Sequence, residues 1–328
     1  MNALSLPFLS ALVGASAGAL ATGLMRSIAR AAGWVAQPNP LVPQHRAPTA
    51  LLGGLGIVSG YLLSIATTSR QIALEQLGLL LPVAGYLLLG TIDDMRPLRA
   101  GTKLAWQSAL ALAAVMLGVR APLSNNGLID GLASACWIVL MVNAVNVTDV
   151  CDGLAAGVAS VGFIALGIWD PATAPLSWAL AGACVGFLSF NRPNASIFMG
   201  DAGSLSLGYL LAGFSLRALG HSGGWHGAIK AVAAGAVFLF EVAFLIAMRR
   251  RKGLPFWRGS RDHFSLRMQA AGFSKWRTNI ISWAAAALAC LAATFAGSVS
   301  AVTTLAMVLT ACGVTACAGL WLSRHEVR

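Results

Sequence analysis

Long apolar runs separated by short polar segments cover most of the chain. A membrane-spanning helix needs roughly 17 to 25 mostly apolar residues, and stretches of this kind without Asp, Glu, Lys or Arg recur along the sequence. Cut at their polar residues, they predict about eleven transmembrane helices, centred on residues 4–25, 51–69, 77–91, 104–119, 131–147, 154–169, 175–190, 204–216, 231–248, 280–296 and 302–322. The pattern predicts an all-α, polytopic integral membrane protein in which residues 1–328 form a single membrane domain.

The composition agrees with this pattern. Hydrophobic residues make up 57% of the chain and charged residues only 10%, with a mean hydropathy of +0.75. A soluble globular domain carries about 25% charged residues, so a soluble or disordered chain is excluded. Six cysteines without paired spacing also exclude a disulfide scaffold.

The positive charges predict the orientation of the chain. The first two, Arg26 and Arg30, follow the first apolar run instead of preceding it, so we expect no cleavable signal peptide and an N-terminus outside. With eleven spans, 18 of the 22 Lys and Arg residues fall in loops on one side. The other four are Arg70, Arg120, Arg217 and Lys230. Because loops rich in Lys and Arg stay in the cytoplasm, the 18-charge side and the C-terminus are expected to be cytoplasmic.

The formal net charge of +11 follows from this arrangement. The basic residues lie in short loops beside helix ends and are not interleaved with aromatic residues, which argues against nucleic-acid binding and for contacts with anionic membrane lipids. The cytoplasmic loops that would form an active face cover about residues 26–50, 93–103, 148–153, 191–203 and 249–278.

Only 11 residues are acidic, so each of them is informative. Seven fall at or near the predicted cytoplasmic helix ends: Asp93, Asp94, Asp149, Asp152, Asp201, Glu241 and Asp262. Ionisable groups at membrane depth are costly and usually face an internal cavity that has a function. We therefore expect these residues to share one cytoplasmic site.

Two adjacent carboxylates, Asp93 and Asp94, end one predicted span. They would repel each other unless a cation or a shared proton lies between them. Lys103, ten residues further on, could offset their charge or hold a phosphate. Alternatively, both are interfacial carboxylates that pair with Arg96 and Arg99.

A second cluster contains Asn146, Asp149 and Asp152, spaced at i, i+3 and i+6. If the helix continues through them, the three oxygen ligands lie along one face. Such oxygen-rich sites suit Mg²⁺ or Mn²⁺ better than zinc. The alternative is a helix end at which Asp149 or Asp152 caps the next span.

A third carboxylate, Asp201, lies in a turn between Gly200 and Gly203, just before a predicted span. Small neighbours allow a ligand to approach the backbone, and the helix start can present N–H groups to a phosphate. As an alternative, Asp201 is only the N-cap of this helix.

A strongly basic segment begins at Arg249 and Arg250 and leads to His263. It would attract a polyanionic soluble substrate; alternatively, the charges only set the topology. His45 and His263 are the two histidines on the predicted cytoplasmic side that are candidates for substrate binding.

Four short motifs occur in order along the chain. Their residues are Pro38-Asn39 with His45, Pro48-Thr49 and Gly53-Gly54; Asp93-Asp94 with Leu98, Lys103-Leu104 and Gln107; Asn143-Ala144-Val145-Asn146-Val147-Thr148-Asp149 with Asp152-Gly153-Leu154; and Phe190-Asn191 with Phe198-Met199-Gly200-Asp201 and Gly203-Ser204. Over about residues 38–272 they resemble the polyprenyl-phosphate N-acetylhexosamine-1-phosphate transferase superfamily, glycosyltransferase family 4. This superfamily includes phospho-N-acetylmuramoyl-pentapeptide transferase and undecaprenyl-phosphate GlcNAc-1-phosphate transferases.

Three departures from the family pattern are visible. Gln37 stands where many members have Asp, and Val150 replaces a usual Gly. The histidine-rich motif after the basic segment keeps only its first histidine, His263. Because this motif is associated with the sugar-nucleotide side of the site, the resemblance does not extend to the identity of the sugar.

The resemblance implies an enzyme that uses Mg²⁺, or alternatively Mn²⁺, to transfer a sugar-1-phosphate from a UDP-N-acetylhexosamine to polyprenyl phosphate with release of UMP. It implies a multi-pass protein of the bacterial inner membrane that acts from the cytoplasmic side in the first membrane step of cell-envelope glycan synthesis, with a homodimer as one option. The implied metal ligands are Asp201 and Asp94, the implied catalytic residues are Asp93, Asp94, Asp149 and Asp152, and the implied substrate-binding residues are His45, Lys103, Asn146, Asn191, Arg249, Arg250 and His263.

Two alternatives remain open. An ion-coupled transporter also has intramembrane carboxylates, but it favours acids near mid-span and broken helices related by internal repeats. Here the acids lie near one face, and the sequence contains no visible repeat. The second alternative is a catalytically inert relative, in view of the shortened histidine motif.

Overall fold

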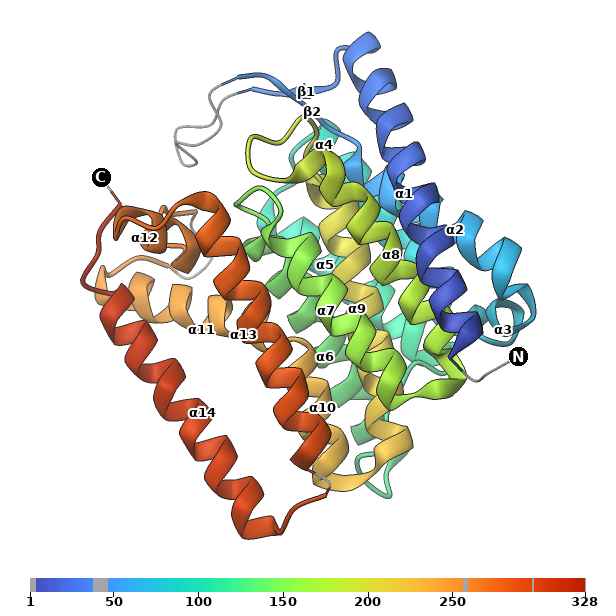
Figure 1. Cartoon of the computed structure of the whole chain (residues 1–328), viewed down its shortest axis with the longest axis vertical. Helices are drawn as coiled ribbons and strands as arrows, with labels where there is room; N and C mark the ends of the chain where they lie inside the picture. The colour runs from blue at the N-terminus through green and yellow to red at the C-terminus, as the bar shows by residue number, and fades with distance from the viewer. Residues whose placement is uncertain (1–3, 38–46, 256–258, 297, 328) are drawn as a thin grey trace.

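The computed structural model describes residues 4–37, 47–255, 259–296 and 298–327 (Figure 1). Helices dominate these residues, so the predicted all-α class is confirmed. In chain order the helices are α1 (Ser5–Ala31), α2 (Gly53–Thr68), α3 (Arg70–Glu75), α4 (Leu77–Met95), α5 (Ala100–Met116), α6 (Gly127–Thr148), α7 (Leu154–Trp169), α8 (Ala174–Asn191), α9 (Gly200–Ser222), α10 (Gly224–Ala234), α11 (Ala236–Arg251), α12 (Phe264–Ala270), α13 (Lys275–Ala296) and α14 (Ala301–Leu322). A 3₁₀ turn, η1 (Pro171–Thr173), precedes α8, and two short strands, β1 (Val35–Ala36) and β2 (Thr49–Ala50), pair antiparallel.

Seven helices in the described part of the chain are long and apolar enough to cross a membrane. They are α1, α4, α6, α9, α13, most of α14, and α8 together with η1. The helices α10 and α11 meet at Gly235 with a bend of 72° and count as an eighth if they form one broken span. These helices identify the protein as a polytopic membrane protein.

Each of the eleven predicted spans coincides with a helix or with the bent pair, but the number eleven and the orientation stay predictions. The apolar helices α2 and α7 have 16 residues each, which is shorter than the roughly 20 residues that a bilayer requires. Helix α5 has 17 residues and contains Lys103 in its first turn.

Helix α9 lies at the centre of the bundle. In its most apolar 18 residues 94% are buried, and it contacts α2, α4, α6, α7 and α10. Small residues let its neighbours approach closely, as is typical of helix packing in membranes. A Cβ on Gly54 of α2 would overlap the backbone of Gly203. A Cβ on Gly90 of α4 would overlap the backbone of Asp201 and Ala202, so the end of α4 lies directly against the start of α9.

The C-terminal helix lies at the edge of the molecule, next to α13 (Figure 1). Only 6% of the most apolar 18 residues of α14 are buried. Its exposed side chains include Leu305, Leu309 and Val314. A helix that is apolar on all sides and not covered by protein is typical of a lipid-facing span.

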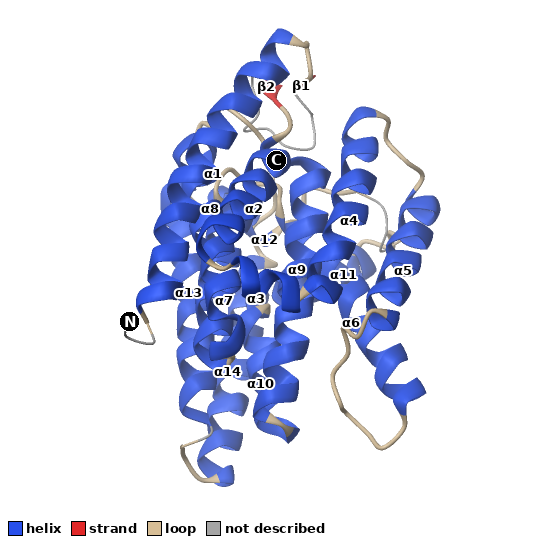
Figure 2. Cartoon of the chain, turned by 90° about the vertical axis from the view of Figure 1, so that its right-hand side faces the viewer, coloured by secondary structure: helices blue, strands red, loops and turns tan. Residues whose placement is uncertain are grey.

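The segment between β2 and α2 runs beside the segment that precedes α9. Ala50 and Ile197 form a parallel bridge, and the N–H groups of Gly53 and Gly54 donate to the carbonyls of Phe198 and Met199, at 3.0 and 2.8 Å. Figure 2 shows the two strands at one end of the helical bundle.

Candidate functional site

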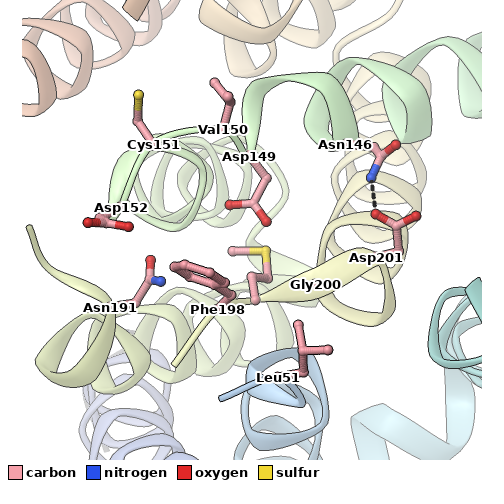
Figure 3. A pocket seen from close by; sticks show the side chains of 11 residues that line it. Leu51, Asn146, Asp149, Val150, Cys151, Asp152, Asn191, Phe198, Gly200 and Asp201 are labelled. Carbon is pink, nitrogen blue, oxygen red and sulfur yellow. Dashed lines mark hydrogen bonds between the residues drawn. The ribbon is translucent and has the colours of Figure 1, made fainter. Parts of the chain in front are cut away.

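A cavity of about 160 Å³ lies where α6 and α8 end and α7 and α9 begin (Figure 3). Three carboxylates and two amide side chains contribute to its wall. The lining residues are Leu51, Asn146, Asp149, Val150, Cys151, Asp152, Asn191, Phe198, Met199, Gly200 and Asp201. Three of the seven acids that were predicted to share one site therefore line this cavity. Glu241 and Asp262 do not line it, and they pair instead with His263 and with Lys252 and Arg267.

Lys103, in the first turn of α5, connects three of the predicted site residues. Its ammonium group donates to Asp93 at 3.0 Å, to the side-chain oxygen of Asn146 at 3.2 Å, and to Asp201. Its side chain is only 16% exposed, so this positive charge is held inside the protein. The contact offsets the charge of two carboxylates from different helices, α4 and α9.

The amide of Asn146 completes this network. Its nitrogen donates to Asp201 at 2.7 Å, the bond drawn in Figure 3, and to the Ser204 hydroxyl at 2.9 Å. Asp201 therefore accepts from Lys103 and from Asn146 through its two oxygens. Its carboxylate does not cap its own helix, which was the alternative interpretation of this residue.

The adjacent acids Asp93 and Asp94 point to different partners. Asp93 accepts from the backbone N–H of Leu98 at 2.6 Å as well as from Lys103. Asp94 accepts from the backbone N–H groups of Asp201 and Ala202, at 2.7 and 3.0 Å. The two carboxylates thus have different partners, which are Lys103 and backbone amides rather than arginines.

The start of α9 is consequently capped by a residue from α4. The N-cap position of α9, Met199, provides no side-chain cap, and Asp94 supplies the negative charge that a helix start favours. This corrects the expectation that the N–H groups of Asp201 and Ala202 face a phosphate, because Asp94 already accepts from both of them.

The predicted common face of Asn146, Asp149 and Asp152 is not formed. Helix α6 ends at Thr148, and Gly153 has a φ of +78° before α7 begins, so the helical periodicity is lost between the first and last residue. Asp149 still lines the cavity together with Asn146. Burial, and then the negative charges of Asp201, Asp94 and Asp152, raise the pKa of the Asp149 carboxyl to about 8.

Asp152 uses its carboxylate to hold neighbouring backbone. It accepts from the N–H groups of Asn194 and Ala195, at 3.1 and 3.3 Å, and lies 3.6 Å from the ammonium group of Lys275. Its carbonyl accepts from the side chain of Asn279 at 2.7 Å. These contacts tie the loop between α6 and α7 to the segment after α8 and to α13.

Asn191 has a similar arrangement. Its side-chain oxygen accepts from the Gly153 N–H at 2.9 Å, and its side-chain nitrogen donates to the Ile197 carbonyl at 2.8 Å.

Sequence reasoning missed Asn279, which is 1% exposed. An amide in the predicted apolar stretch after Arg277 was the available signal for it.

Three further predicted binding residues, Arg249, Arg250 and His263, do not line this cavity. Arg249 is buried and its Nε lies 3.4 Å from the Ser260 hydroxyl, whereas Arg250 is exposed. His263 contacts Glu241, with 2.5 Å between Nδ1 and Oε1. His45 lies outside the described residues. The substrate-binding roles of all four stay predictions.

Comparison with known proteins places the chain in a family. The sequence pattern of the family described as Glycosyl transferase family 4 matches residues 76–219. The decaprenyl-phosphate N-acetylglucosaminephosphotransferase of Mycobacterium tuberculosis is 32% identical over 83% of this chain and 78% of that protein. The chain belongs to glycosyl transferase family 4.

Other relatives in glycosyl transferase family 4 carry two different names. The decaprenyl-phosphate N-acetylglucosaminephosphotransferase of Mycolicibacterium smegmatis is 34% identical over 72% of this chain and 67% of that protein. The phospho-N-acetylmuramoyl-pentapeptide-transferase of Halalkalibacterium halodurans is 31% identical over 76% of this chain and 83% of that protein. The relatives therefore agree on the family but differ in the sugar named.

The charges around the cavity indicate whether a divalent cation fits. Within the described ranges, no three His, Cys, Asp or Glu side chains form a ready metal cluster. Mg²⁺, however, is usually held by one or two carboxylates together with water and substrate phosphates. Asp201 supplies such a carboxylate in the wall of the cavity, and Asp149 and Asp152 lie in the same wall. The donor chemistry thus fits a hard divalent cation.

Proposed function

We propose that this chain transfers an N-acetylhexosamine-1-phosphate from a UDP-sugar to polyprenyl phosphate, giving a polyprenyl-diphospho-sugar and UMP. Membership of glycosyl transferase family 4, with relatives named for decaprenyl phosphate and for phosphosugar transfer, supports this reaction. The structural observation that carries it is the buried Lys103, which joins Asp93, Asn146 and Asp201 beside a cavity lined by carboxylates.

Phosphoryl transfer depends mainly on positioning the two phosphates and neutralising their charge. Lys103 supplies a fixed positive charge, and Asn146 orients the carboxylate of Asp201. Asp149 is the acid that we assign to hold a proton at its carboxyl oxygen toward a phosphate, in keeping with its raised pKa. Asp93 and Asp94 hold Lys103 and the start of α9, and Asp152 holds the loop that carries Asp149.

We propose Mg²⁺ as the cofactor, with Mn²⁺ as an alternative ion. Asp201 is its first ligand and Asp149 lies beside it in the cavity wall. Asp94 stays a proposed ligand through the lone pairs that its two backbone hydrogen bonds leave free. When bound, the ion would polarise the diphosphate and neutralise its charge.

We further propose eleven spans in the bacterial inner membrane, with the N-terminus outside and the C-terminus in the cytoplasm. The distribution of Lys and Arg supports this orientation, because 18 of the 22 lie on one side. The site then faces the cytoplasm, where a nucleotide sugar is soluble, and lies near the interface where a lipid phosphate resides. This placement suits the first membrane step of cell-envelope glycan synthesis.

The direct test uses purified protein in detergent with Mg²⁺, polyprenyl phosphate and a panel of UDP-sugars. The lipid product is read by mass spectrometry and UMP is measured in parallel. We expect a polyprenyl-diphospho-sugar with one of the UDP-N-acetylhexosamines and no net UMP without the lipid. Sustained UMP release without polyprenyl phosphate would identify a hydrolase, and no turnover with any sugar would support the inert relative.

A further inference from the structure

Glu241 is a buried carboxylate that the proposed reaction does not use. It lies in α11, its side chain is only 1% exposed, and a buried carboxylate is costly unless it is paired and hydrogen-bonded. Both of its oxygens have partners. Oε1 lies 2.5 Å from Nδ1 of His263, and Oε2 accepts from the backbone N–H of Phe264 at 3.1 Å.

These two contacts fix the beginning of α12. His263 is the N-cap residue of this helix and provides no side-chain cap of its own, so the first N–H groups of α12 need an acceptor from elsewhere. Glu241 accepts from the N–H of Phe264, the first residue of the helix. One carboxylate therefore sets both the helix start and the orientation of the His263 ring.

The same short helix forms part of the surroundings of the cavity. The thiol of Cys151, which lines the cavity, donates to the Ser265 hydroxyl at 3.1 Å. The side chain of Gln269, one turn further along α12, lies 3.4 Å from the same sulfur. Shifting α12 would therefore move a wall of the cavity.

We propose that Glu241 is a positioning residue for His263. It holds a proton on Nδ1 and leaves Nε2 as the ring nitrogen that accepts a hydrogen bond from a hydroxyl or N–H group of the nucleotide sugar. A carboxylate that accepts from one imidazole nitrogen determines which nitrogen is available to a ligand. That the ligand is a nucleotide sugar rests on the proposed function. Which nitrogen of the His263 ring carries the proton does not depend on that function.

The first measurement needs no substrate. Protein labelled with ¹⁵N-histidine is compared with Glu241→Leu, which removes the acceptor at similar volume, and the His263→Asn variant assigns the signal. We expect a proton on Nδ1 of His263 in the original protein and loss of this preference in Glu241→Leu. An Nδ1 without a proton, or an unchanged signal in Glu241→Leu, would overturn the proposal.

Two further variants distinguish the loss of the carboxylate from a folding defect. Glu241→Asp keeps a carboxylate and should restore part of the Nδ1 signal, and Glu241→Gln, whose one carbonyl oxygen cannot accept from both partners, should give an intermediate result. If Glu241→Leu does not fold, the measurement on the original protein still decides, because an Nδ1 without a proton overturns the proposal. Glu75→Leu, at an exposed glutamate of α3, is the matched control and should behave as the original protein.

The kinetic test is a double-mutant cycle in the transfer assay. Glu241→Leu and His263→Ala should each raise the KM for the UDP-sugar by about 10-fold, as for the loss of one hydrogen bond, with a smaller effect on kcat, and the double variant should be no worse than His263→Ala. Additive effects would show that Glu241 acts independently of His263. An inactive protein with the expected imidazole signal would refute only the proposed function.

Discussion

The carboxylate of Asp94 accepts a hydrogen bond from the backbone N–H of Asp201, with 2.7 Å between Oδ1 and N. This bond links the last turn of α4 to the first turn of α9. It depends on Gly90, one turn earlier in α4, because a Cβ there would overlap the Asp201 backbone. Asp201 is thereby placed so that its side chain reaches Lys103 and Asn146.

Removing the cap that Asp94 provides should destabilise the protein and also reduce its turnover. In Asp94→Ala the two N–H groups at the start of α9 lose their acceptor, which costs about 1–2 kcal/mol for a typical cap. We expect a lower unfolding temperature in detergent and reduced turnover, with a smaller loss in Asp94→Asn. Glu75→Ala is the control at an exposed position. Unchanged unfolding of Asp94→Ala would refute the capping role.

Lys103 should be required for the reaction. Lys103→Met removes the charge that joins Asp93 and Asp201, and we expect kcat to fall by about 100-fold or more, as when one preorganised donor is removed from an active site. Steady-state release of UMP measures this. Arg96→Met changes an exposed basic residue just after the end of α4 and should keep most activity. Equal losses in both variants would contradict a specific role of Lys103.

Asp201 should determine the metal dependence. Asp201→Asn keeps one oxygen acceptor, for Lys103 or for Asn146 but not for both, and it removes the negative charge that a divalent cation requires. We expect metal-dependent UMP release to disappear across a titration with Mg²⁺, while the protein stays folded at the assay temperature with a somewhat lower unfolding temperature. If Asp201→Asn has the turnover of the original protein and the same dependence on Mg²⁺, Asp201 is not a metal ligand.

Acid should weaken the loop before α12 through Asp262. Burial alone would raise the pKa of this carboxyl, but hydrogen bonds from Lys252 and Arg267, at 2.7 and 2.6 Å, outweigh it and lower the pKa below its usual value. The stabilisation is therefore complete above about pH 4, the pKa of an unfolded Asp, and is lost as the pH falls through the folded pKa.

Unfolding temperatures measured between about pH 3 and pH 6 test this effect of Asp262. Asp262→Asn should be less stable than the original protein at the upper end of this range, and the difference should shrink as the pH falls. Glu326→Asn, at a residue whose side chain is 73% exposed, should follow the original curve. An equal difference at every pH would show that the charge of Asp262 contributes nothing.

Most residues of the site could be predicted from the sequence, because they lie next to the ends of apolar runs. Lys103, Asn146, Asp149 and Asp201 could each be recognised as polar residues that lipid-facing positions would not tolerate. Their contacts were not predictable. Asp94 and Asp201 are 107 residues apart, and their bond depends on how closely two helices approach, which the apolar pattern does not specify.

The arrangement of α11, α12 and α13 was the least accessible from sequence. The bend of 72° between α10 and α11 lies within one apolar run, so the pattern predicted a single span there. The contact between Glu241 and His263 joins residues of two separate segments, and Asn279 gave only a lone amide as a signal. In both cases tertiary packing, rather than local periodicity, decides where the side chain lies.

The path of the β-phosphorus of the UDP-sugar tests the central claim most directly. With UDP-sugar labelled at this atom, polyprenyl phosphate and Mg²⁺, we predict that the label moves into the lipid fraction as a diphospho-sugar while unlabelled UMP is released. Label that leaves as UDP, or as water-soluble sugar-1-phosphate, would contradict transfer of a sugar-1-phosphate to the lipid.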